Sequence, residues 1–364
     1  MASTLTTRPL LSPEEIAVQA GQQVPFLRLP ERAGVFAERE MRLRQRAASH
    51  PMRDFLLFMA ELAHAQQAVL QTQPAVVLPD REALGAASRL GAPPLPATLW
   101  PRDPAWRDAL ALLVATLLPR LAGSPAEAGV KALRDADPVW LEQQADRLLG
   151  GQMFGLDLAA APLIAAALQT YWTQLVLATD AARGADQAAP FGRVDDATRC
   201  PCCASLPTAS VTRIGAESAG YRYLHCSLCS TQWHMVRVKC SHCEQTRGIG
   251  YQSLRLAGDD AAPSAARARP AVEAETCDEC GHYLKIVHME RDPHVEPVAD
   301  DLASLTLDLL VSEAGFQRHG INLMLLFGDP DPQDEGANVA PAGAAAAPTA
   351  SGRPRPPDDD GGGG

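Results

Sequence analysis

The sequence predicts an α+β protein, in which an all-helical N-terminal domain precedes two small, cysteine-rich β modules. Three observations lead to this fold class. Apolar residues recur at helical spacing through the first half of the 364-residue chain. Eight of the nine cysteines form four Cys-x-x-Cys pairs after residue 199. Short runs with strand-like alternation lie between those pairs. A C-terminal helix and a disordered tail complete the prediction.

Residues 1–180 have the periodicity of a helical domain. The clearest helix lies in HPMRDFLLFMAELAHAQQAVLQ, whose apolar residues fall three and four positions apart and therefore share one face. Ser12 and Glu15 form a capping-box pattern that predicts an earlier helix. A loop is expected at the proline-rich GAPPLPATLWP. Further helices are predicted near 103–122, 137–149 and 157–178.

The composition changes after residue 180. Small and breaker residues predict a linker, the cysteine pairs define two modules, and a helix restarts after DPHVEPV, with Asp300 and Asp301 as candidate caps. The last residues are low in complexity, which is typical of disorder. The predicted boundaries are 1–180 for the helical domain, 181–199 for the linker, 200–239 and 240–292 for the two modules, 293–328 for the C-terminal helical segment and 329–364 for the tail.

Composition indicates a globular protein of the cytoplasm. The chain is 46% hydrophobic, and its formal net charge of −11 argues against general nucleic-acid binding by the whole surface. The N-terminus lacks the basic and apolar regions of a secretory signal. The apolar segment Leu156–Ala178 contains Asp157 and Pro162, so we expect a buried core helix and no membrane span. Structural disulfides are disfavoured in the cytoplasm, where clustered cysteines are more often metal ligands.

The cysteine pairs predict two tetrahedral metal sites. A Cys-x-x-Cys turn presents two sulfurs to one ion, and a second pair on a hairpin completes the site. Two sequential modules, each like a rubredoxin or zinc-ribbon knuckle pair, fit the spacing best, although a cross-braced arrangement is possible. Four thiolates suit zinc or a single rubredoxin-type iron. The expected ligands are Cys200, Cys203, Cys226, Cys229, Cys240, Cys243, Cys277 and Cys280.

Four further residues lie beside these ligands. Cys202 lies inside the first pair, and we interpret it as a spare thiol. His225, His242 and His282 adjoin ligands. Each could complete a three-cysteine, one-histidine site, but with four cysteines available they are better interpreted as neighbouring or surface groups.

These residues carry a resemblance to a known family. The order of the four pairs, the linking segment QWHMVRVKCSHC and the closing segment HVEPVADDLASLTLDLLVSEAGFQRHGINLMLLFG resemble the formate dehydrogenase accessory protein family, FdhE, over about residues 10–328. The resemblance implies a helical domain, two rubredoxin-like modules and the eight cysteine ligands named above. It also implies action in the cytoplasm on the catalytic subunit of respiratory formate dehydrogenase before export.

Two function classes compete. The first is a maturation factor that binds a protein client and has no catalytic activity. The second is a zinc-ribbon nucleic-acid-binding protein, because residues 199–255 carry seven basic and two acidic side chains, a net charge of +5. That basic bias also suits an acidic protein partner. A redox or sulfur-relay enzyme would need a reactive thiolate outside a closed site, and Cys202 is the only candidate.

Overall fold

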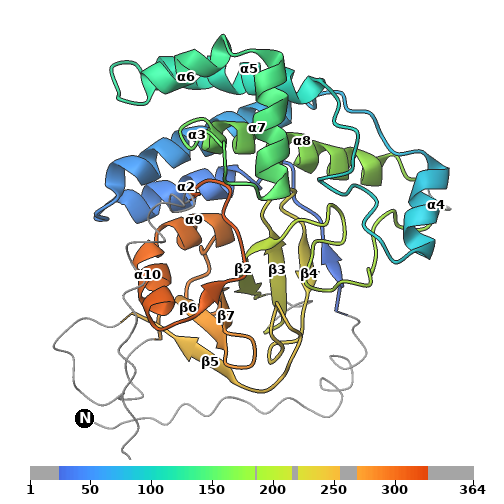
Figure 1. Cartoon of the computed structure of the whole chain (residues 1–364), viewed down its shortest axis with the longest axis vertical. Helices are drawn as coiled ribbons and strands as arrows, with labels where there is room; N and C mark the ends of the chain where they lie inside the picture. Colours follow the sequence, from blue (N-terminus) through green and yellow to red (C-terminus); the bar gives the residue numbers. More distant parts are fainter. Residues whose placement is uncertain (1–23, 185–186, 215–219, 255–268, 327–364) are drawn as a thin grey trace, which may run out of the picture. The chain divides into compact units, whose positions relative to one another are not determined.

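The N-terminal half of the chain is helical, as its apolar periodicity predicts (Figure 1). The computed structural model describes residues 24–184, 187–214, 220–254 and 269–326. The helix predicted at Ser12 and the predicted tail therefore lie outside the described residues. The helices of this half are α2 (Ala37–Ala47), α3 (Arg53–Gln71), α4 (Arg81–Arg89), α5 (Ala105–Leu117) with the 3₁₀ turn η1 (Leu118–Arg120), α6 (Glu127–Arg134), α7 (Pro138–Gly150) and α8 (Ala161–Ala181).

Helices α3 and α8 supply much of the apolar core. The predicted stripe of α3 faces inward, with Leu56, Met59 and Leu62 buried. Helix α8 is buried on nearly every side, because it carries no charged residue before Asp180. It is a core helix, and among the described residues no helix has the length and apolarity needed to cross a bilayer.

Helix α2 was not predicted, because its sequence AEREMRLRQRA is dominated by charge. Two of its arginines are nevertheless buried. Arg39 pairs with Glu296 at 3.2 Å, and Arg42 pairs with Asp300 at 2.8 Å. The face that α2 turns inward is therefore partly ionic, and a search for apolar periodicity does not detect such a face.

The strands of both cysteine-rich segments join one mixed sheet. Its order is β1-β4-β3-β2-β7-β6-β5, and β8 also pairs with β7. The β2–β7 and β7–β8 pairs are parallel and the others antiparallel. The strands are β1 (Leu27–Arg28), β2 (Pro207–Thr212), β3 (Arg222–Cys226), β4 (Gln232–His234), β5 (Ile249–Gln252), β6 (Val272–Cys277), β7 (His282–His288) and β8 (Gln317–Arg318).

The parallel β2–β7 pair connects the two cysteine-rich segments. It sets Ser210 opposite Ile286, residues far apart in the sequence. The described residues accordingly fall within one compact unit, Met1–Phe327. The fold class is confirmed, and the two modules share one sheet. The finer domain boundaries stay a prediction.

Two short helices follow the sheet, α9 (Pro297–Leu302) and α10 (Leu305–Glu313). The predicted caps Asp300 and Asp301 are wrong. Glu296 is the N-cap, and its side chain accepts a hydrogen bond from the Ala299 amide at 2.7 Å. The helix begins earlier than expected because Pro297 fits the first helical position. Asp300 and Asp301 lie inside α9, where buried cations neutralise them.

Two cations, Arg318 of β8 and Lys285 of β7, neutralise Asp301. Lys285 Nζ lies 3.0 Å from the Asp301 carboxylate, and it also pairs with Asp308 of α10. Arg318 of β8 reaches Asp301 at 2.7 Å. Burial alone would raise the pKa of Asp301, but Arg318 and Lys285 outweigh it and hold that pKa below its usual value. These ion pairs fix α9 and α10 to the sheet beside the second cysteine-rich segment.

Candidate metal centres

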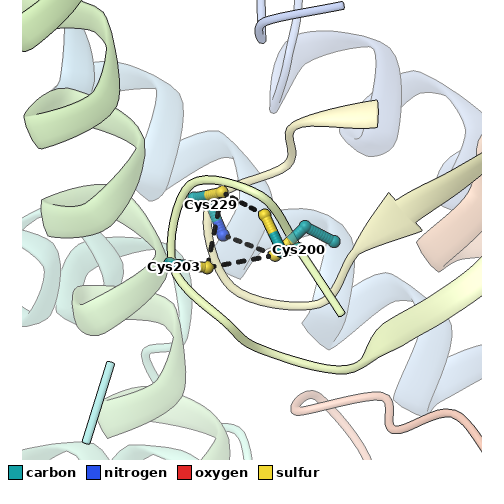
Figure 2. A group of neighbouring side chains, drawn as sticks. Cys200, Cys203 and Cys229 are labelled. Carbon is teal, nitrogen blue, oxygen red and sulfur yellow. Dashed lines mark hydrogen bonds between the residues drawn. The ribbon is translucent and has the colours of Figure 1, made fainter. Parts of the chain in front are cut away.

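The eight paired cysteines gather into two groups of four. The first group contains Cys200, Cys203, Cys226 and Cys229, and the second contains Cys240, Cys243, Cys277 and Cys280. The arrangement is the sequential one, because each group draws on neighbouring pairs of the chain. In Figure 2 the sulfurs of Cys200, Cys203 and Cys229 converge on one point between their loops.

The distances between sulfurs fit a tetrahedral ion. In the first group, Sγ atoms lie 3.5 Å apart for Cys200–Cys229 and 3.4 Å apart for Cys203–Cys226. In the second, Cys240–Cys280 and Cys243–Cys277 are each 3.7 Å apart. A metal–sulfur distance of ~2.3 Å places tetrahedral sulfurs roughly 3.8 Å apart. All nine cysteines are free thiols. Each group could therefore hold one metal ion, and four thiolates suit zinc or iron.

The same backbone turn recurs in all four Cys-x-x-Cys pairs. The residue after the second cysteine has a left-handed backbone, with φ values of 62° at Ala204, 58° at Ser230, 61° at Glu244 and 68° at Gly281. Only one of these residues is glycine, so three turns keep a side chain where it costs about 1 kcal/mol. This reversal aims both sulfurs of a pair at one point.

Backbone N–H groups of these turns point at sulfur. In the first group, the amides of Leu228 and Cys229 each donate to Cys226 Sγ at 3.4 Å. In the second, the His242 amide donates to Cys240 Sγ at 3.4 Å. Such donors stabilise a thiolate, which is the form that binds metal.

The first group is buried against the helical half. None of its four cysteines is more than 1% exposed. The proline-rich loop predicted before α5 contacts it directly, because the amides of Leu95 and Ala97 donate to the carbonyls of Cys202 and Cys203 at 2.9 Å. That loop seals one side of the first group.

Gln169 of α8 links the first group to the helices. Its Nε2 donates to the carbonyl of Ser227, between Cys226 and Cys229, at 2.7 Å. Its Oε1 accepts from Gln66 of α3 at 3.0 Å. Sequence reasoning missed Gln169, because a glutamine in an otherwise apolar helix carries no signal of its partner. A buried amide in such a helix does indicate that some partner exists.

Hydroxyl groups distinguish the first group from the second. Ser205 Oγ lies 3.4 Å from Cys203 Sγ, and Thr231 Oγ1 lies 3.3 Å from Cys229 Sγ. Each hydroxyl stands two residues after the second cysteine of its pair and can donate to a thiolate. The equivalent positions of the second group are Gln245 and His282. The sequence did contain a signal for these hydroxyls, because Ser205 and Thr231 each stand two residues after the second cysteine of a first-group pair.

Burial and the neighbouring cysteines shift the pKa values of several of these thiols in opposite directions. Burial, followed by the neighbouring thiols, raises the pKa of Cys200. Burial acts in the same direction on Cys229, but hydrogen bonds from the neighbouring cysteines outweigh it and lower that pKa well below its usual value. Cys243 behaves likewise, helped by the Gln245 backbone. Burial also raises the pKa of Cys240. Because thiolates are the form that binds metal, filling the groups must release the protons of Cys200 and Cys240.

The second group lies closer to solvent. Cys240 and Cys277 are buried, whereas Cys243 and Cys280 are only half-buried. Its loops are held by Arg222 of β3, whose Nη1 donates to the Lys239 carbonyl at 2.8 Å. Arg222 is itself buried and pairs with Glu275 of β6 at 2.7 Å.

Cys202 and His225 stand beside the first group without joining it. Cys202 is fully buried, and Thr231 Oγ1 donates a hydrogen bond to its Sγ at 3.6 Å. Burial raises the pKa of this thiol, which disfavours the reactive thiolate. Burial lowers the pKa of His225 to about 3, and Gln232 Nε2 lies 3.3 Å from its Nδ1. His225 is therefore a neutral, buried neighbour and not a surface group.

A helical half joined to a β-sheet that carries two four-cysteine groups defines the class of protein: a two-site, thiolate-rich protein of the rubredoxin-like type. Family models described as FdhE N-terminal, FdhE central domain and FdhE C-terminal domain match residues 24–189, 199–237 and 238–325. The chain belongs to the FdhE family of formate dehydrogenase accessory proteins.

Individual relatives agree with the family models. The chain is 40% identical over 312 residues to a protein FdhE homolog from Cronobacter sakazakii and to protein FdhE from Salmonella arizonae, with 85% of this chain and 94% of each relative covered. The crystal structure of the FdhE protein from Pseudomonas aeruginosa matches with a TM-score of 0.70 at 38% identity. That match covers 83% of this chain and 98% of the other.

Proposed function

We propose that the eight paired cysteines are the ligands of two metal ions, iron or zinc, with four thiolates at each. Convergence of all eight sulfurs into two groups of four supports this assignment. Four protein ligands saturate a tetrahedral ion and leave no position for water or substrate. Ions held in this way would stabilise structure or pass electrons, and would not activate water.

A closed pair of sites suits an accessory protein better than an enzyme. We propose that the chain binds the catalytic subunit of respiratory formate dehydrogenase in the cytoplasm and is required for formation of active enzyme, without turnover of its own. Membership of the FdhE family supports the formate dehydrogenase link. Burial of Cys202 speaks against the sulfur-relay alternative, because that thiol is closed off from a substrate.

The zinc-ribbon alternative loses part of its basis in the structure. Arg222, one of the basic residues counted toward a nucleic-acid surface, is buried and paired with Glu275. Lys239 pairs with Glu244, and Arg199 lies 3.5 Å from Asp196. These pairs reduce the cationic field that a phosphate backbone would meet.

A deletion strain tests the proposed function. Without the protein, the formate dehydrogenase polypeptide should accumulate, but respiratory formate oxidation should be lost. Tagged catalytic subunit should copurify with the wild-type chain. Normal formate oxidation in the deletion strain would sink the proposal. Binding of duplex DNA or RNA that persisted at high salt would instead support the zinc-ribbon alternative.

A matched pair of variants tests the ligand assignment. Cys203→Ala should lower the metal content by one ion per chain, whereas Cys202→Ala, a neighbouring and equally buried thiol, should leave it unchanged. Elemental analysis of anaerobically purified protein measures both and identifies the metal. Equal metal content in the two variants would contradict the assignment.

A further inference from the structure

Three histidines cluster at the edge of the second cysteine group. His242 lies between Cys240 and Cys243, while His282 begins β7 and His319 directly follows β8. The His242 and His282 rings stack with centroids 3.8 Å apart and planes 18° apart. The His319 ring packs edge-on against His242 at 4.9 Å. Segments distant in the chain thus bring three imidazoles together, beside thiols.

One sulfur of the second group belongs to this cluster as well. Potential ligand atoms of His242, His282 and Cys280 all lie within 4.8 Å of one another. An ion with metal–nitrogen and metal–sulfur distances of ~2.1 and ~2.3 Å holds such donors roughly 3.6 Å apart. The His242 and His282 rings would have to turn out of their stacked arrangement for their nitrogens and the Cys280 sulfur to reach one ion. A thiolate has lone pairs to spare after binding one ion, so Cys280 can bridge two.

The hydrogen bond of His282 selects the tautomer that a ligand needs. Its Nδ1 lies 2.8 Å from the Cys280 carbonyl oxygen. A carbonyl oxygen only accepts, so Nδ1 carries a proton, and in the neutral ring Nε2 is the nitrogen available to a metal ion. Metal-binding histidines are commonly oriented by this kind of bond, from the second ring nitrogen to a backbone carbonyl.

The cluster is open to solvent on one side and buried on the other. His242 is exposed, and Cys280 and His282 are half-buried, so an ion can approach from solvent. On the inner side, His319 is 8% exposed, and its Nε2 has no hydrogen-bond partner among the described residues.

We propose that His242, His282 and Cys280 form a further, exchangeable cation site for a borderline divalent ion such as Zn²⁺ or Co²⁺. This inference rests on the proposed role of Cys280 as a ligand of the second four-cysteine ion, which it would share as a bridging thiolate. With three protein ligands, the site keeps a position for solvent. It should bind more weakly than either four-cysteine group and exchange its ion with the medium.

Cobalt titration of the full-length chain tests this site. Metal-free protein, prepared anaerobically, is dialysed against increasing Co²⁺, and bound cobalt per chain is measured together with thiolate-to-cobalt absorption. Wild type should take up two ions tightly and a third more weakly. The double variant His242→Ala/His282→Ala should keep the two tight ions and their charge-transfer bands, but lose the third. His294→Ala, which removes an exposed histidine outside the cluster, should still bind three.

The outcomes separate the two proposals. Equal uptake of two ions by wild type and the double variant overturns the additional site alone. Equal uptake of three ions also overturns it, because the third ion would then lie elsewhere. Uptake of fewer than two ions by wild type overturns the four-cysteine sites, and the additional site with them. If the alanine variant misfolds by circular dichroism, His282→Gln replaces it, since glutamine keeps the size and polarity of the side chain.

Discussion

The two four-cysteine groups have the same local turns but opposite surroundings. Every pair uses the left-handed residue after its second cysteine. The first group, however, belongs to the same apolar core as α3, α5 and α8, whereas the cysteines of the second group lie outside that core. The comparison shows that the same Cys-x-x-Cys turn forms in an apolar core and near the surface. Packing around the turn decides how much of the fold depends on its ion.

The hydrogen bonds around the two groups also differ, because the first group is bonded to the helical half and the second to the sheet. The first group is bonded to α8 through Gln169 and to the proline-rich loop through Leu95 and Ala97. The second group is held mainly by the sheet, through Arg222 and the strands β5 to β7. Loss of the first ion should therefore spread into the helices, whereas loss of the second should remain local.

The two groups should differ most in how far unfolding spreads when one cysteine ligand is removed from each. Apparent binding energies of structural zinc, about 10–16 kcal/mol, match or exceed the whole stability of a typical domain, about 5–15 kcal/mol. Cys226→Ala should therefore unfold the helices together with the first group. Cys277→Ala should unravel only the second group and leave α8 protected. Hydrogen exchange and limited proteolysis read both effects. The same protection pattern in both variants would show that the helices do not depend on the first group more than on the second.

Chelation should separate the two ions in time. The second group has two half-buried cysteines, so a chelator can reach its ion, whereas the first group is closed. We expect biphasic release, with the second ion leaving at least about tenfold faster, because local opening costs less free energy than opening of the core. The Cys277→Ala variant should show the slow phase alone. Monophasic release from wild type would contradict the difference in access.

Gln169→Leu should weaken the link between α8 and the first group. It leaves the Ser227 carbonyl without its donor, at a cost of about 1–3 kcal/mol. The control is Gln174→Leu, on the same helix, whose amide donates to the Pro74 carbonyl at 3.0 Å. Both variants should melt earlier, but only Gln169→Leu should speed release of the first ion. Equal release rates would show that the Gln169 contact does not support the metal site.

Relieving the left-handed turns should have the smallest effect. Ala204→Gly should raise stability by about 0.5–1 kcal/mol, because glycine adopts this conformation without a Cβ penalty. The same strain exists at Glu244 in the second group. If that group unfolds locally, Glu244→Gly should slow release of the second ion without raising the global melting temperature. A rise in melting temperature with both variants would indicate that the two groups unfold together.

Several features follow from residue pattern alone. Apolar periodicity predicted α3, α5, α7 and α8, and the cysteine spacing predicted two sequential groups of four. Charge obscured α2, whose inward face is built on Arg39 and Arg42. The predicted caps Asp300 and Asp301 failed for a related reason. The sequence does not show whether an aspartate near the start of a helix caps that helix or forms an ion pair with a buried cation such as Lys285.

The sequence by itself determined the fold class, the family and the eight sulfurs that converge in fours, because a Cys-x-x-Cys turn is a local property of a few consecutive residues. Only the tertiary structure decided that the two groups share one sheet through β2 and β7, that Gln169 contacts the first group, and that three histidines meet beside the second. These features join residues distant in the chain. Burial and partnership depend on how such segments pack, and no short stretch of sequence encodes them.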